Sequence, residues 1–245
     1  FCGLIFSSWA SRIPSIKAAF HLNEAQLGTV LMMLPMGSFI ALPIAGWAVD
    51  RFSSRWMTLV SCIGYALMLY LISRAGTVFI LSISLFFFGF MGDIMNIAMN
   101  TQGLDVQHRM QKPILSSFHG MWSLGALAGA LICSFTLEQS MTTVTHFTII
   151  MIAVMIISIL MFGFLIPADD KAEEGKKLFA MPDRALWLIG MICFCCALCE
   201  GAMADWSSLY YQSVVNNPAS VSTTGFTAYI FAMTVGRFTG DRLLV

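Results

Sequence analysis

Long stretches without charged residues dominate this sequence and limit what it can fold into. Residues 25–49 and 56–73 contain no charged side chain, and residues 75–104 contain only Asp93. Each stretch is long enough to cross about 30 Å of hydrocarbon as a helix of about 20 residues. Four more apolar stretches follow, at 113–137, 139–168, 185–205 and 206–236, the last expected to be a loop followed by a helix. We therefore predict seven complete membrane spans after a shorter apolar stretch at the start.

The composition supports an all-α membrane protein and excludes several other classes. Apolar residues make up 58% of the chain and charged residues only 11%, whereas about 25% of the residues in a soluble domain are charged. A β-barrel needs segments of about ten residues that alternate in polarity, and these stretches are continuously apolar. Lys plus Arg equals Asp plus Glu, at 13 each, and no basic stripe indicates a nucleic-acid partner. The lipid bilayer is the expected solvent, and no cofactor is expected.

The expected topology divides the chain into two unequal parts. The mixed-charge segment 167–184 is predicted to be a cytoplasmic linker. Residues 1–166 are then a six-helix half whose first helix is truncated, because the opening apolar stretch is too short to span. Residues 185–245 supply the first two helices of a second half. With the linker in the cytoplasm, ten Lys and Arg residues, including Arg237 and Arg242, lie on that side against three opposite, as the positive-inside rule requires.

A short internal repeat supports two halves of similar layout. The pair Asp50-Arg51 follows the second span, and Asp241-Arg242 follows the eighth, 191 residues later. Ser8-Trp9 is expected to end the first span and Asp205-Trp206 the seventh, 197 residues apart. Two pairs at nearly one period, on matching sides of the membrane, are typical of transporters built from parallel repeats.

The loop Gly46-x-x-x-Asp50-Arg51-x-x-x-Arg55 resembles the signature loop between helices two and three of the major facilitator superfamily. Other stretches resemble its fucose-permease-like branch of fucose, galactose and glucose proton symporters: Trp9-Ala-Ser-Arg-Ile-Pro14, Asn96-Ile-Ala-Met-Asn100-Thr-Gln, Phe118-His-Gly-Met-Trp-Ser-Leu-Gly125, Glu200-Gly-Ala-Met-Ala-Asp-Trp206 and Ala232-Met-Thr-Val-Gly-Arg-Phe-Thr-Gly-Asp-Arg242. The resemblance covers the whole chain. It implies a twelve-helix fold, of which this chain holds part of helix one through helix eight, with a central site between the halves and alternating access driven by a proton gradient.

Polar side chains inside the predicted spans are candidates for a substrate and proton pathway. A charge at mid-bilayer costs about 2.5–3.5 kcal/mol on insertion scales, so intramembrane acids normally face a cavity or a partner. Asp93 and Glu200 are two such acids. Asp93, Asn96 and Asn100 share one helical face, although the resembling family often has an acid where Asn96 stands. The alternative for these residues is hydrogen bonding that holds helices together.

Four more residues complete the predicted pathway. His119 shares a helical face with Ser116 and Ser123, and a neutral imidazole can bond a hydroxylated solute or pass a proton. Asp205 lies between Glu200 and the external water. Trp9 and Trp206 occupy equivalent positions in the repeat and are suited to stacking on sugar rings, while the alternatives are packing for His119 and placement at the membrane interface for the tryptophans.

Charged residues at the cytoplasmic ends of the spans are expected to gate the transporter. If they resemble the family loop, they form charge pairs between the halves that break when the protein opens inward. The alternative is that the arginines only set the topology. The predicted gating residues are Asp50, Arg51, Arg55, Asp241 and Arg242.

Metal chemistry and enzymatic activity are not expected. All seven cysteines lie in apolar stretches, where a thiol behaves as a small hydrophobic group. The run from Cys193 to Cys199 fits helix packing better than a structural zinc site, which needs four convergent ligands. The sequence has no His-Glu-x-x-His, Gly-x-Ser-x-Gly or P-loop pattern.

These observations predict a secondary active transporter of the inner membrane. The leading hypothesis is proton-coupled symport of a small polar solute such as a sugar, by a protein that is a monomer when complete. An exporter of amphipathic compounds is the second hypothesis, suggested by the Met-rich and Phe-rich spans. A membrane sensor with the same fold that transports nothing is the third.

Overall fold

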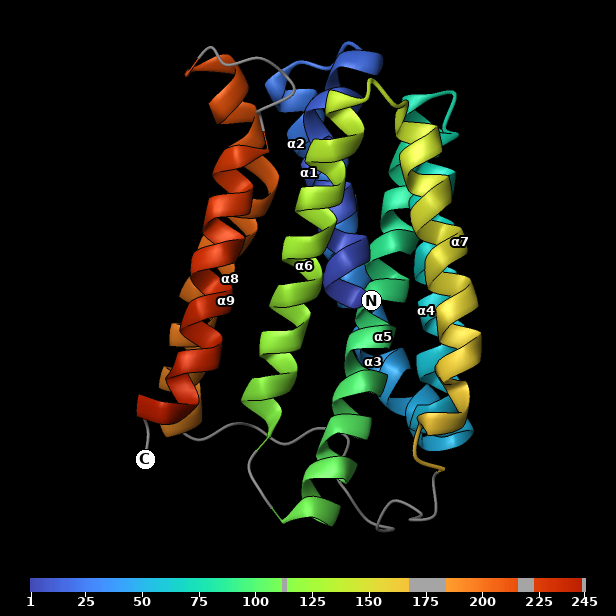
Figure 1. The fold of residues 1–245 in the computed structure, drawn as a ribbon, viewed down its shortest axis with the longest axis vertical. Helices are drawn as coiled ribbons and strands as arrows, with labels where there is room; N and C mark the ends of the chain where they lie inside the picture. Colours follow the sequence, from blue (N-terminus) through green and yellow to red (C-terminus); the bar gives the residue numbers. More distant parts are fainter. Residues whose placement is uncertain (112–113, 168–183, 216–222, 244–245) are drawn as a thin grey trace.

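The computed structural model describes residues 1–111, 114–167, 184–215 and 223–243, and the regular structure in these ranges is entirely helical (Figure 1). The helices are α1 (Cys2–Ala19), α2 (Glu24–Leu31), α3 (Met33–Phe52), α4 (Ser54–Ser73), α5 (Val78–Met110), α6 (Leu115–Glu138), α7 (Thr143–Met161), the 3-10 turn η1 (Phe162–Phe164), α8 (Arg184–Ser213) and α9 (Thr224–Leu243). Among the described residues, six segments are long and apolar enough to cross a membrane. The predicted all-α membrane fold is confirmed.

The second span is built from two helices, and the sequence explains the break. Asn23 starts α2 with a capping box, in which its side chain accepts from the backbone of Gln26 and the Gln26 side chain accepts in return. Pro35 has no N–H and its ring conflicts with the carbonyl four residues earlier, which belongs to Leu31, where α2 ends. Pro43 lies inside α3 without ending it.

Two helices extend further than the sequence indicates. The first span does not end near Trp9, because α1 continues to Ala19 with Arg12 inside it. Likewise α8 continues past Trp206 to Ser213, and the following helix begins only at Thr224. The expectation that Ser8-Trp9 and Asp205-Trp206 end their spans is therefore wrong, although each pair lies well inside a helix.

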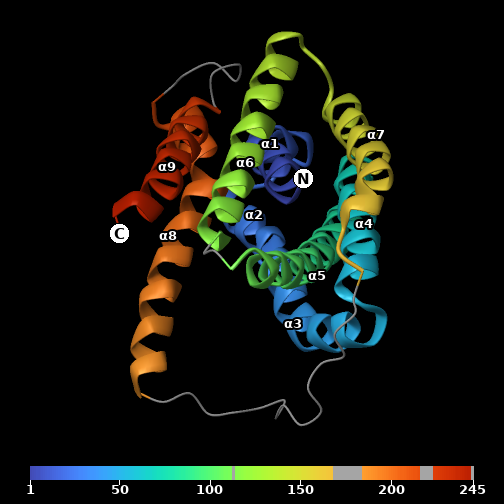
Figure 2. The same cartoon turned by 60° about the horizontal axis from the view of Figure 1, so that its bottom comes forward.

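Helix α1 occupies the centre of the bundle. It packs against α6 most extensively and also against α4, α5, α7 and α8. Figures 1 and 2 show α4 and α7 at one edge and the pair α8–α9 at the other, beside α6. Residues from both groups belong to one buried apolar cluster, which includes Ile5 and Trp9 of α1 as well as Phe226 and Ile230 of α9. The arrangement brings polar residues of several helices to the middle of the molecule.

Glycines allow the helices around this centre to approach backbone to backbone. A Cβ atom at Gly37 of α3 would lie 1.9 Å from the carbonyl oxygen of Phe86, and one at Gly89 of α5 would lie 2.0 Å from that of Leu34. A Cβ at Gly3 of α1 would likewise lie 2.1 Å from a backbone oxygen of α6. Small residues at such contacts are what packing of membrane helices requires.

Replacing Gly89 with alanine is therefore expected to destabilise the full-length protein by about 2–3 kcal/mol, as overpacking does. The added methyl group forces α3 and α5 apart, because the atom that it meets belongs to the backbone. Thermal unfolding in detergent measures the effect. Gly28→Ala is the matched control, since a Cβ at Gly28 meets nothing within 4 Å; equal stability of the two variants would contradict the proposed role of the close contact.

Candidate functional site

A cavity of about 310 Å³ lies in the middle of the bundle, between helices from both ends of the chain. Its walls combine aromatic, amide and charged side chains with two glycines of α5. The lining residues are Cys2, Phe6, Leu34, Ser38, Tyr65, Gly89, Gly92, Asp93, Asn96, His119, Trp122, Glu200 and Arg237. Four of the predicted pathway residues are thus brought together here: Asp93, Asn96, His119 and Glu200.

Helix α5 contributes the amide and carboxyl groups of one wall. The side-chain amide of Asn100 donates to the side-chain oxygen Oδ1 of Asn96 over 3.3 Å, so both amides are oriented along one face. The Oδ2 atom of Asp93 is buried and has no hydrogen-bond partner among the described residues. Gly89 and Gly92 also line the cavity beside this carboxyl group, and the backbone of Leu34 and the ring of Tyr65 pack closely against them. An unpartnered carboxyl oxygen in a membrane cavity is suited to bind a solute or a proton.

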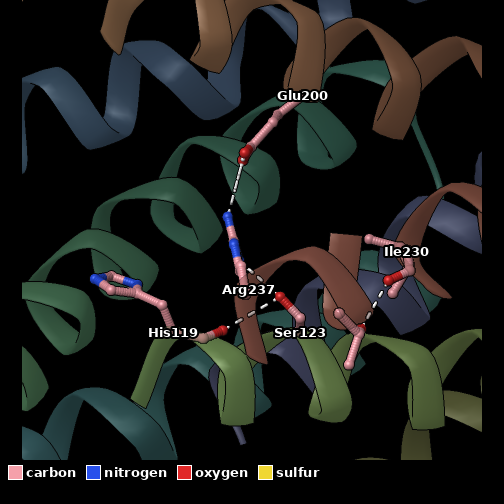
Figure 3. Close-up of polar contacts among 6 residues, drawn as sticks. His119, Ser123, Glu200, Ile230 and Arg237 are labelled. Carbon is pink, nitrogen blue, oxygen red and sulfur yellow. Dashed lines mark hydrogen bonds and ion pairs between the residues drawn. The ribbon is translucent and has the colours of Figure 1, made fainter. Parts of the chain in front are cut away.

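The opposite wall holds an ion pair between α8 and α9 (Figure 3). The Nη2 atom of Arg237 lies 3.2 Å from Oε1 and 3.4 Å from Oε2 of Glu200. Its Nη1 atom donates to Ser123 of α6 over 2.7 Å. The guanidinium carbon also lies 5.5 Å from the ring centre of Trp122, within reach of a cation–π interaction. Arg237 therefore joins α8, α9 and α6 around the cavity.

Side chains of α6 bind both the side chain and the backbone of Arg237. The hydroxyl group of Ser123 donates to the carbonyl oxygen of His119 over 3.2 Å, which leaves its lone pairs for Arg237. The hydroxyl group of Ser116 donates to the carbonyl oxygen of Arg237 over 3.4 Å. The imidazole of His119 points away from the Arg237 guanidinium (Figure 3), so its nitrogens are not used by this network.

Arg237 was not predicted from the sequence to be a site residue. The positive-inside rule assigns it to the cytoplasmic cations, together with Arg242. The structure instead places it in the cavity with Glu200. One sequence signal could have indicated this: Arg237 is the only charged residue between Thr224 and Gly240, as expected for a cation that needs a partner inside the membrane.

The other predicted pathway residues do not line the cavity. Trp9 is only 1% exposed and packs in the core, with its ring centre 6.2 Å from that of Phe88. Asn100 is not a lining residue, but its side chain is hydrogen-bonded to that of Asn96, which is one. Asp205 is partly buried one turn beyond Glu200, and Trp206 is 40% exposed.

The predicted gating residues are spread over two regions. Asp50 and Arg51 are exposed at the end of α3. Arg55 donates to the carbonyl oxygen of Phe162 over 3.2 Å, and its guanidinium stacks on the Phe162 ring at 4.4 Å. The side chains of Asp241 and Arg242 lie outside the described part of the structure.

In the described ranges, no three His, Cys, Asp or Glu residues are placed to hold a metal ion.

Comparisons with known proteins identify the family. The sequence profile of the Major Facilitator Superfamily matches residues 1–245. The chain is 30% identical over 246 residues to the uncharacterized transporter y4wD of Sinorhizobium fredii, covering 99% of this chain and 64% of that protein. It is 31% identical over 248 residues to an uncharacterized MFS-type transporter of Yersinia pestis, covering 99% and 63%, and 28% identical over 241 residues to the membrane protein MosC of Rhizobium meliloti, covering 98% and 59%.

A solved structure supports the same conclusion for the fold. A mutant of the nucleoside transporter NupG superposes with a TM-score of 0.68 at 16% sequence identity, over 99% of this chain and 64% of that one. The chain thus spans less than two thirds of the length of the relatives that it matches. It belongs to the major facilitator superfamily of multi-pass membrane transporters.

Proposed function

We propose that the full-length protein is a proton-coupled symporter that carries a small polar solute, such as a sugar, across the inner membrane. The proposal includes the division into a first half (1–166), a linker (167–184) and a second half that begins at residue 185. The Glu200–Arg237 ion pair carries the argument, because it lies in a cavity lined by both halves. The motifs that resemble the fucose-permease-like branch support the same class of solute.

The ion pair supplies a site where proton binding changes the contacts between the halves. Ionised Glu200 accepts from Arg237, and such bonds to charged groups contribute about 1.5–3 kcal/mol. A proton on Glu200 removes the negative charge and weakens this bond. The described contacts of the Arg237 guanidinium are then those with Ser123 and Trp122 of the first half. On protonation of Glu200, Arg237 therefore exchanges its bond to the second half for bonds to the first half or to a bound solute.

The lining of the cavity suits a small hydroxylated solute. The carboxyl group of Asp93 lines the cavity and can accept hydrogen bonds from hydroxyl groups, while the side chains of Asn96 and His119 can both donate and accept. The rings of Tyr65 and Trp122 offer flat apolar surfaces. A volume of about 310 Å³ lies at the small end of the range of about 300–1,000 Å³ for small-molecule sites, which favours a sugar over a bulky amphipathic compound.

The first experiment identifies the solute. Thermal stabilisation of the full-length protein is measured against a panel of sugars and polyols at two pH values. We expect a stabilising sugar whose effect depends on pH, because binding and protonation share the Glu200–Arg237 pair. Stabilisation by amphipathic compounds, with none by sugars, would instead support an exporter.

Glu200→Gln then tests proton coupling with the solute found. We expect the variant to lose accumulation driven by a proton gradient while it keeps solute exchange, since glutamine is isosteric but cannot release a proton. Uptake and counterflow in proteoliposomes separate the two activities. Glu138→Gln, at an exposed site near the end of α6, is the matched control. Unchanged accumulation by the Glu200 variant would remove this carboxyl group from the mechanism.

A further inference from the structure

Gln102 of α5 binds the backbone just before the linker through both ends of its amide. Its Oε1 atom accepts from the N–H of Ile166 over 2.9 Å, and its Nε2 atom donates to the carbonyl oxygen of the same residue over 3.0 Å. The Nε2 atom also donates to the hydroxyl group of Ser54 over 2.7 Å. Gln102 is only 6% exposed. One buried amide therefore satisfies both backbone groups of a single residue, as a neighbouring strand would.

A second contact holds the same segment four residues earlier. Arg55 of α4 donates to the carbonyl oxygen of Phe162 over 3.2 Å and stacks on its ring at 4.4 Å. The ring of Trp56 lies on Phe162 as well, with 4.6 Å between the ring centres. The segment 162–166 is thus bound at both of its ends, by the start of α4 and by the last third of α5.

The chemistry of this contact is specific to the residues present. An amide side chain can donate to and accept from the backbone of one residue at the same time, whereas methionine cannot donate and accepts only weakly, and ionised glutamate cannot donate. Leaving a buried backbone N–H or carbonyl unpaired costs about 1–3 kcal/mol. Arg55 also belongs to the loop motif Gly46-x-x-x-Asp50-Arg51-x-x-x-Arg55, and here its partner lies in the first half.

We propose that Ser54, Arg55, Trp56 and Gln102 form a linker anchor, which fixes the segment 162–166 to α4 and α5 as one rigid unit. The linker then departs from a fixed point on the first half whenever the two halves move relative to each other. The anchor also joins the α3–α4 junction to the same unit, because Ser54 directly follows it. This inference does not depend on the solute or on proton coupling.

Hydrogen exchange of the full-length protein, resolved at the amide of Ile166, tests the anchor without any ligand. We expect Gln102→Met to speed this exchange at least tenfold, because the acceptor of the Ile166 N–H is lost. Arg55→Met removes a contact with Phe162 and none with Ile166. If the segment is one unit, this variant should still speed exchange at Ile166 at least threefold. An unchanged Ile166 rate in Arg55→Met would overturn the proposal, since the two contacts would then be independent.

Gln107→Met is the matched control on the same helix. Gln107 accepts from the backbone N–H groups of Ile114 and Leu115 over 3.0 and 3.3 Å, so its replacement should speed exchange there and leave Ile166 unchanged. Should Gln102→Met not fold, Ser54→Ala removes one of the three bonds of Gln102. We expect it to speed Ile166 exchange about threefold, and an unchanged rate would overturn the proposal equally.

Discussion

Under the proposed proton-coupled symport, replacing Arg237 with methionine is expected to reduce proton-driven uptake by the full-length protein at least 100-fold. The change removes the partner of Glu200 at 3.2 Å and the donor to Ser123 at 2.7 Å. Each bond to a charged group contributes about 1.5–3 kcal/mol, and about 1.4 kcal/mol corresponds to a factor of ten. The loss of both is thus large enough to account for the expected effect. Initial uptake rates in proteoliposomes, of the solute that the thermal-stability panel identifies, provide the measurement.

Two further variants separate the chemistry of Arg237 from its role in packing. Arg237→Lys keeps the charge but not the planar fork that reaches Glu200 and Ser123 together, so we expect intermediate uptake. The double variant Glu200→Gln with Arg237→Met leaves neither member of the pair charged and should unfold at a higher temperature than Arg237→Met alone. It should still show no proton-driven accumulation. Accumulation by Arg237→Met near the wild-type level would show that the ion pair plays no part in coupling.

The sequence was sufficient to predict six of the seven expected spans, all but the one that contains α9, because lipid imposes a simple rule on them. A helix in hydrocarbon satisfies its own backbone, and its side chains must be apolar over about 20 residues. Asp93 and Glu200 were identifiable for the same reason, since an acid inside such a stretch needs a partner or a cavity. Asp93 and Glu200 line the same cavity because of how the helices pack. This packing cannot be read from the linear sequence.

Arg237 and Trp9 show where this reasoning stops. The position of Arg237 depends on where α9 begins, and a helix that starts at Thr224 places it beside Glu200 in the cavity. Trp9 was predicted from the repeat to be near the end of a span, but α1 continues for ten more residues. The continuing helix can bury Arg12 because this side chain finds partners that lie 124 to 134 residues away in the chain. No local pattern predicts such contacts.

Arg12→Met is expected to destabilise the full-length protein by about 2–4 kcal/mol, which corresponds to a thermal transition lower by about 5–10 °C. Arg12 is 3% exposed and donates to Thr136 and to the carbonyl oxygen of Met141, each over 3.0 Å, and to Nδ1 of His146 over 3.4 Å. It therefore fixes α1, which carries Cys2 and Phe6 of the cavity wall, to α6 and α7. Thermal unfolding in detergent measures the loss.

Two opposing free-energy changes decide the sign of the Arg12→Met effect. Removing the cation saves its insertion cost, which is about 2.5–3.5 kcal/mol at mid-bilayer and smaller toward the ends of a span. Met141 lies in the turn between α6 and α7, so Arg12 is near such an end. Three acceptors lose their donor, at about 1–3 kcal/mol each, and this loss outweighs the saving. Arg74→Met, at an exposed position, is the matched control and should be neutral. An Arg12 variant as stable as that control would mean that α1 is held by its apolar packing alone.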